Sequence, residues 1–214
     1  MSTECSRGFG HRLTKPRRGY AIWDATSARI LNRNFPPVIV VLHSAHSMRV
    51  LGVDCGGEFT GYGVIEQDEQ GTLRHLSSGA IRLSSREALE IRLMKISNGL
   101  TVVIGDYSPE IVAIEDVFYA VNAKSALRLG HIRGVAMLTA AQAGLAVMAY
   151  SPLSIKSAVV GYGRAEKAQV QLMVARLLGL PAPPEPPDVA DALAIAICHL
   201  HTAATLERQQ AAVK

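Results

Sequence analysis

Cysteine and long apolar runs are both scarce in this chain of 214 residues. The three cysteines, Cys5, Cys55 and Cys198, are odd in number and far apart, so they fit neither a disulfide framework nor a zinc knuckle. No apolar run approaches the roughly 20 residues that cross a bilayer. The run at 38–42 is also shorter than a secretory signal core, which needs about 7–15 residues. We therefore expect a cytoplasmic protein with no membrane partner.

Acidic residues are scarce at the start of the chain. Residues 1–47 hold seven Lys and Arg against two Asp and Glu, whereas residues 48–214 hold fifteen against sixteen. The net charge of +4 thus belongs to the first segment and is poor evidence that the rest binds nucleic acid. That segment also lacks any sustained apolar period.

These differences predict three parts. We expect residues 1–47 to be a dispensable N-terminal extension, either disordered or produced by a start assigned upstream of Met48. A basic DNA-binding arm and an organellar transit peptide are the alternatives for this segment. Residues 48–203 are expected to form one globular domain, and residues 204–214 a C-terminal tail.

From Met48 onward the apolar pattern is typical of an α/β domain. Short apolar runs predict strands at 48–54, 60–65, 73–83, 111–115 and 145–150. Helical spacing predicts helices at 86–106, 123–143, 156–161, 165–178 and 188–201, with Ser85 capping the first. The first three strands read as an antiparallel meander with a turn at 67–71, and the later strands alternate with helices. The predicted fold is a mixed five-stranded sheet flanked by helices on both faces.

Four carboxylates occupy informative positions. Asp54 and Glu115 each end an apolar strand, and the carboxyl ends of neighbouring parallel strands meet at one edge of a sheet. Asp188 and Asp191 lie three residues apart at a helix start, so they share one helix face. Four converging carboxylates repel one another unless cations neutralise them, and oxygen ligands favour magnesium or manganese over zinc. Two such ions can activate a water and stabilise the leaving oxygen of a phosphodiester.

Each carboxylate also has an ordinary structural interpretation. Asp188 follows prolines and could simply cap a helix, and Asp54 precedes a Gly-Gly turn. Glu115, at the end of the run Ile-Val-Ala-Ile, is harder to explain in this way. From spacing alone, a metal site and a purely structural role are about equally supported.

Five segments then occur in a specific order and spacing: LGVDCG at 51–56, GYGV at 61–64, IEDVF at 114–118, NAKSALRLGHIRG at 122–134 and DVADALA at 188–194. Together they resemble the bacterial RuvC family of crossover junction endodeoxyribonucleases. The resemblance extends from residue 48 to about residue 203. Five motifs in register are far more specific than any one of them.

The resemblance implies a ribonuclease-H-like fold and a homodimer. It implies two Mg²⁺ ions per subunit, with Mn²⁺ as a possible substitute. The implied substrate is four-way junction DNA, resolved in recombination and repair by symmetric nicks that leave 5′-phosphate and 3′-hydroxyl ends. The RuvA–RuvB branch-migration complex is the implied partner. The family's catalytic and metal-binding positions match Asp54, Glu115, Asp188 and Asp191.

The resemblance also implies contacts with DNA. Lys156 and Lys167 match lysines near the scissile phosphate, Phe118 matches an aromatic residue that acts on unpaired junction bases, and Arg133 is a candidate phosphate contact. Surface lysines more often lie on a solvated helix face, and a Phe in this context is more often part of the core.

Some positions depart from the family pattern. Cys55 stands where proline is common, and we interpret it as a small packed residue, although it could also make the site sensitive to oxidation. His131, His199 and His201 have no partners at metal-ligand spacing, so we interpret them as surface or helix-packing residues.

Three other functions remain as alternatives. An ATP-binding protein of the sugar-kinase and actin type shares the fold core, but its adenosine motif is missing and residues 48–214 are too few for its two domains. A nuclease that trims ribosomal RNA precursors is shorter and lacks the segment 118–133. A junction-binding module without catalysis is disfavoured by the four intact carboxylates.

Overall fold

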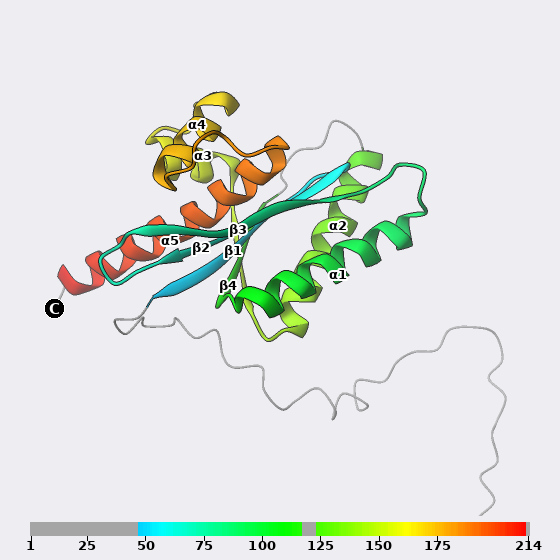
Figure 1. The fold of residues 1–214 in the computed structure, drawn as a ribbon, viewed down its shortest axis with the longest axis horizontal. Coiled ribbons are helices and arrows are strands. Elements are labelled where there is room, and N and C mark those ends of the chain that lie inside the picture. The colour runs from blue at the N-terminus through cyan, green and yellow to red at the C-terminus, as the bar shows by residue number, and fades with distance from the viewer. Residues whose placement is uncertain (1–46, 117–122, 213–214) are drawn as a thin grey trace, which may run out of the picture. The chain divides into compact units, whose positions relative to one another are not determined.

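The structure is a computed structural model that describes residues 47–116 and 123–212 (Figure 1). Its elements are β1 Met48–Cys55, β2 Phe59–Gln67, β3 Leu73–Arg82, α1 Leu89–Tyr107, β4 Ile111–Glu115, α2 Ala123–Gln142, β5 Ala146–Tyr150, α3 Pro152–Val160, α4 Lys167–Leu177 and α5 Pro187–Ala212. The five strands form one sheet in the order β3-β2-β1-β4-β5. β1, β2 and β3 pair antiparallel, whereas β1–β4 and β4–β5 are parallel. The predicted mixed sheet is therefore confirmed.

Helices cover both faces of the sheet (Figure 1). On one face, Leu51 and Val53 of β1 pack into a core that includes buried residues of α1 and α2. On the other face, Val50 of β1 packs into a core dominated by α5 with contributions from α3 and α4. Successive residues of a strand point to opposite faces, so Asp54 lies on the α5 side of the sheet.

Small residues let α5 lie directly on the sheet. A Cβ added at Gly52 would lie 2.0 Å from the Ala192 carbonyl oxygen, and one added at Gly61 would lie 2.0 Å from the Asp188 carbonyl oxygen. The stretch from residue 187 to 206 is apolar and long enough to cross a membrane, but most of it is buried inside this protein. α5 is therefore the central core helix, and its first turn is pressed against the end of β1.

Three predicted helix ends differ from those in the structure. Helix α1 begins at Leu89 with no side-chain cap, so the predicted cap by Ser85 is wrong; a local turn around Ser84 precedes the helix. Helix α3 begins at Pro152, four residues before the predicted start, because Ser151 caps it with a bond from the Ser154 N–H of 3.1 Å. Helix α5 continues to Ala212, past its predicted end at 201 and through most of the predicted tail.

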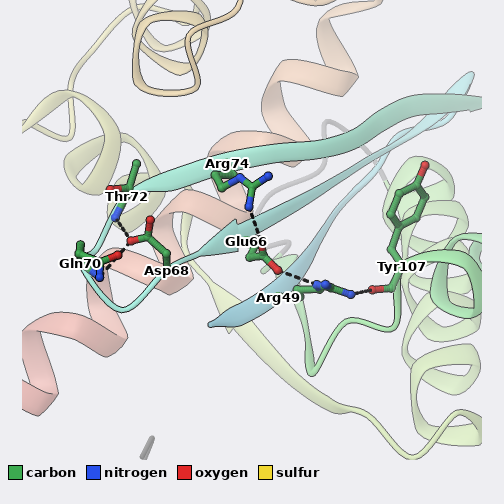
Figure 2. A network of polar contacts seen from close by, with 7 residues as sticks. All are labelled: Arg49, Glu66, Asp68, Gln70, Thr72, Arg74 and Tyr107. Carbon is green, nitrogen blue, oxygen red and sulfur yellow. Dashed lines mark hydrogen bonds and ion pairs between the residues drawn. The ribbon is translucent and has the colours of Figure 1, made fainter. Parts of the chain in front are cut away.

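A network of ion pairs lies where β1 begins (Figure 2). The Glu66 carboxylate accepts from Arg49 Nε at 2.9 Å and from Arg74 Nη1 at 3.3 Å. Arg49 also donates to the Tyr107 carbonyl oxygen at the end of α1, at 3.1 Å. Next to the network, Asp68 accepts two backbone N–H bonds and closes the predicted β2–β3 turn. Each charged side chain of this network, Arg49, Glu66 and Arg74, has a partner of opposite charge.

Candidate active site

The four predicted carboxylates come from three elements that meet at one end of the sheet. Val53 of β1 is paired with Ile114 of β4, so the next residues, Asp54 and Glu115, lie side by side. The first turn of α5 brings in the two aspartates. A Cβ added at Gly56 would lie 2.7 Å from Asp188 Oδ1, so the glycine turn after β1 is in close contact with this carboxylate.

A pocket of about 310 Å³ opens between these elements. Asp54, Glu115 and Asp191 line it together with Lys156 of α3 and Lys167 of α4. The rest of the lining is apolar: Pro152, Ile155, Val170, Ala194 and Ile195. The structure thus brings both predicted lysines to the same pocket as three of the four predicted carboxylates, with Asp188 beside the turn that follows Asp54.

Burial and mutual repulsion dominate the electrostatics of the pocket. Burial raises the pKa of Asp54 to about 7, and the negative charges of Asp191, Glu115 and Asp188 add to this rise. Burial is also the main cause that raises the pKa of Glu115 and of Asp191. Nearby lysine charge opposes these shifts without cancelling them. The pocket therefore holds more negative charge than its lysines compensate.

Lys167 is the cation in direct contact with the carboxylates. Its Nζ lies 2.5 Å from Asp191 Oδ2. Burial alone would lower the pKa of Lys167, but the hydrogen bond and charge of Asp191, together with the charges of Asp54 and Asp188, outweigh that effect and the pKa is raised. The lysine is the first residue of α4, and its backbone is fixed there by the capping box between Glu166 and Gln169.

The donor set fits a hard divalent cation. The four carboxylates carry the oxygen donors that magnesium and manganese prefer, and no thiolate or imidazole of the described residues lines the pocket. Within residues 47–116 and 123–212, however, no three His, Cys, Asp or Glu side chains lie close enough to form a closed ligand group.

Arg133 lies at the end of β4. Its Nε donates to the Glu115 carbonyl oxygen at 3.3 Å, and its Nη2 lies 3.3 Å from Asp116 Oδ1. The guanidinium thus contacts the chain on both sides of the Glu115–Asp116 bond, and its contact with phosphate stays a prediction. Phe118 lies outside the described residues, and its role on junction bases also stays a prediction.

The remaining candidates are packed or exposed as expected. Cys55 is buried, and burial followed by the charge of Asp54 raises the pKa of its thiol to about 12, as for an unreactive packed residue. His199 Nδ1 lies 2.7 Å from Tyr150 Oη, and His201 Nδ1 lies 2.9 Å from the Ala158 carbonyl oxygen. These two histidines pack α5 against its neighbours, whereas His131 is exposed on α2.

Sequence reasoning missed Arg92. This residue of α1 is only 5% exposed and donates from Nη2 to the Gly57 carbonyl oxygen at 2.5 Å, in the turn that follows Asp54. A signal was present, because Arg92 belongs to the buried stripe of α1 together with Ile96, Leu100 and Val103. An arginine in an apolar stripe is unusual and marks a buried charge.

A mixed sheet with carboxylates at the ends of β1 and β4 and on the last helix is the arrangement of the ribonuclease-H-like class of proteins. The family model described as crossover junction endodeoxyribonuclease RuvC matches residues 50–199. The chain is 65% identical over 164 residues to the crossover junction endodeoxyribonuclease RuvC of Koribacter versatilis, covering 77% of this chain and 99% of that protein. It is 54% identical over 169 residues to the same protein of Acidobacterium capsulatum, covering 76% and 99%.

Solved structures agree with these relatives. Thermus thermophilus RuvC matches with a TM-score of 0.69 and 34% identity, covering 75% of this chain and 98% of that one. The same protein in complex with Holliday junction substrate matches with a TM-score of 0.71, covering 75% and 97%. The chain belongs to the RuvC family of crossover junction endodeoxyribonucleases. Its ribonuclease-H-like fold is thereby confirmed, and the kinase-like and ribosomal RNA-trimming alternatives are excluded.

Proposed function

We propose that this chain resolves Holliday junctions by hydrolysing phosphodiesters at the pocket formed by Asp54, Glu115, Asp188 and Asp191. The observation that most directly supports this proposal concerns Asp54. Its carboxylate is partly buried beside three other carboxylates, and its pKa is raised to about 7. A cluster of this kind costs stability, so its presence at strand ends supports a catalytic role.

The cofactor that suits this pocket is a pair of Mg²⁺ ions, with Mn²⁺ as substitute, held by the four carboxylates. When bound, the ions lower the pKa of a water and stabilise charge on the leaving oxygen. The chain's own contribution is to place the carboxylate oxygens that would hold these ions beside the scissile phosphate. The apolar lining, including Ile155 and Ile195, excludes bulk water and strengthens every charge interaction in the pocket.

The two lysines in the pocket are placed to bind the scissile phosphate. Lys156 and Lys167 supply positive charge at its wall, and Lys167 now neutralises Asp191. With divalent cations bound at Asp191, the Lys167 ammonium would be available to contact phosphate instead. Lys167→Met is then expected to weaken cleavage more than it weakens junction binding.

Asp54→Asn tests this function. The variant should bind a synthetic four-way junction in EDTA as wild type does, because affinity comes mainly from phosphate neutralisation elsewhere. It should not cleave the junction in magnesium. Cleavage within about ten-fold of wild type, where loss of a catalytic group usually costs far more, would contradict the assignment.

Phe118 is proposed to act on unpaired bases at the junction. It follows Glu115 by three residues, just beyond a strand end that opens on the pocket. Stacking of a base on an aromatic side chain contributes about 1–3 kcal/mol. Phe118→Ala should therefore impair cleavage and leave the melting temperature unchanged. A large loss of stability, about 3–5 kcal/mol as for a buried Phe, would indicate a core residue instead.

The active unit is proposed to be a homodimer, since two symmetric cuts require two sites related by a two-fold axis. The outer faces of α1 and α2 carry exposed apolar residues that suit such an interface: Met94, Val102, Leu127 and Leu138. Dimers that combine one wild-type and one Asp54→Asn subunit should nick junctions without separating them. Full resolution by a demonstrated monomer would contradict the dimer.

In this proposal the enzyme works on DNA in the cytoplasm, in recombination and repair, together with the RuvA–RuvB branch-migration complex. Addition of RuvA–RuvB to a cleavage assay tests the partnership. The proposal predicts that RuvA–RuvB speeds the resolution of junctions whose branch point must move before they can be cleaved.

A further inference from the structure

We infer that Arg92 of α1 and Arg133 of α2 are positioning residues, which hold the two catalytic strand ends from the face of the sheet opposite to α5. Each guanidinium contacts the main chain next to a proposed catalytic carboxylate: Gly57 O near Asp54, and the carbonyl oxygen of Glu115 itself. The inference rests on the proposed function, because it assigns a role towards those carboxylates.

Arg92 acts on the turn between β1 and β2. The turn begins with a bond of 3.1 Å from the Gly56 N–H to the Asp54 carbonyl oxygen, and Gly56 is in close contact with the Asp188 carboxylate. Arg92 donates to the next residue, Gly57. By fixing this turn, Arg92 fixes the main chain that carries Asp54 and the surface against which Asp188 rests.

The energetic cost of burying Arg92 indicates that this residue serves function rather than stability. The residue is 5% exposed, and its Nε has no hydrogen-bond partner among the described residues. A buried charge with incomplete hydrogen bonding destabilises a fold, and an apolar side chain of similar volume is often equally stable or more so. An arginine that only filled the core of α1 would therefore be the poorer choice. Its hydrogen bond to Gly57 and its charge interaction with Glu87 are what distinguish it from an apolar residue.

Arg133 acts in the same way on β4. Its two contacts, with the Glu115 carbonyl oxygen and the Asp116 carboxylate, bracket the peptide that carries Glu115. On the other side of this peptide, the Asp116 N–H donates to the Tyr150 carbonyl oxygen at 2.8 Å. The end of β4 is thus held by α2 and β5 together. The Arg133 side chain is 23% exposed and makes both of these contacts, so it is placed to orient Glu115.

The test compares Arg92→Met and Arg133→Met with Arg86→Met and Arg128→Met. The two control residues are exposed arginines, one just before α1 and one on α2, so each control removes the same charge. Four quantities are measured: the melting temperature without metal, junction affinity in EDTA, the rise in melting temperature on adding Mg²⁺, and the Mg²⁺ concentration for half-maximal cleavage. Arg92→Lys and Arg133→Lys test for partial rescue, because lysine keeps one donor.

Both Arg→Met variants should melt within about 2 °C of wild type or higher, and Arg92→Met should bind junctions normally in EDTA. Cleavage should fall about 10–100-fold, as it does when residues that orient metal ligands are lost. The Mg²⁺ requirement should rise and the Mg²⁺-induced rise in melting temperature should shrink. The Lys variants should recover part of both. The controls should match wild type.

Asp54→Asn, measured in parallel, separates this inference from the proposed function. If Asp54→Asn is inactive but the Arg→Met variants have the Mg²⁺ requirement of their controls, the positioning role is wrong. A fall in melting temperature with an unchanged Mg²⁺ requirement would likewise overturn it in favour of a structural role. If Asp54→Asn is active, the proposed site itself is wrong.

Discussion

The two ends of β1 differ in whether their buried carboxylates are paired with positive charge. At its beginning, Glu66 has a side chain only 9% exposed and is paired with Arg49 and Arg74 (Figure 2). At its end, Asp54 shares a site with three other carboxylates, and the nearest cation, Lys167, is already paired with Asp191. The first arrangement satisfies its carboxylate, whereas the second leaves negative charge uncompensated.

The contrast separates structural from functional charge. A buried carboxylate with two arginine partners ties together β1, β2 and β3 and needs nothing from outside the chain. Carboxylates that raise one another's pKa are stable only with added positive charge, which marks a site for cations or substrate. Substitutions at the two ends of β1 should therefore have different consequences.

Removing charge at the catalytic end should have the largest effect. Glu115→Gln and Asp191→Asn should each reduce junction cleavage by on the order of 10³-fold or more, because each removes a ligand needed in the transition state. Junction affinity in EDTA should be unchanged. Rates of cleavage under single turnover measure this effect, with Glu66→Gln as the matched variant at the other end. Equal losses of cleavage activity for Glu66→Gln and Glu115→Gln would show that the two ends of β1 do not differ in function.

The pH dependence of stability should come from the catalytic end. The pKa of Asp54 in the folded protein is about 7, above its ordinary value of 3.8, so the folded state holds its proton where the unfolded state has lost it. Without metal, the free energy of unfolding should therefore fall as pH rises from about 4 to 7, by on the order of 1–3 kcal/mol. Urea denaturation in EDTA at several pH values measures this change. Asp54→Asn should flatten the curve, and an unchanged slope would refute the assignment.

Disrupting the paired end should affect stability alone. Glu66→Ala removes hydrogen bonds to two arginines and should cost about 1–3 kcal/mol of folding free energy. Cleavage per folded molecule, measured well below the melting temperature, should stay at the wild-type level. A loss of cleavage without loss of stability would show that this end of the sheet also takes part in catalysis.

The smallest effect is expected from removing residues 1–47. Among the described residues, all those that line the pocket lie after Met48, and the family model matches residues 50–199. A chain of residues 48–214 should therefore cleave junctions within about two-fold of the full chain at physiological salt. A larger loss that is greatest at low salt and shrinks as the salt concentration rises would support the basic-arm interpretation instead.

The sheet and the carboxylates are predictable from the sequence because both depend on local patterns. Apolar runs define β1 and β4, which end at Cys55 and Glu115, so the apolar pattern alone places Asp54 and Glu115 at strand ends. Asp188 and Asp191 are three residues apart, so any helix that contains both places them on the same face. The family resemblance then selects a metal site where spacing alone leaves two interpretations.

Contacts between distant elements are not predictable in this way. The Arg92–Gly57 bond joins residues 35 apart, and the Arg133–Glu115 bond joins residues 18 apart, so no local pattern records them. The apolar pattern places the start of α3 too late, because the cap at Ser151 and the proline after it precede the apolar residues. It places the end of α5 too early, because the polar last turns of this helix lack an apolar stripe.

The central claim is that the carboxylate end of the sheet is completed by divalent cations. The most direct measurement is the melting temperature of the free protein against Mg²⁺ or Mn²⁺ concentration at pH 8, for wild type, Asp54→Asn and Glu66→Gln. Binding to the folded state alone stabilises by about 1.4 kcal/mol at ten times the dissociation constant. We predict a saturable rise for wild type and Glu66→Gln, and a much smaller one for Asp54→Asn. The same rise in all three proteins, or none in wild type, would contradict the claim.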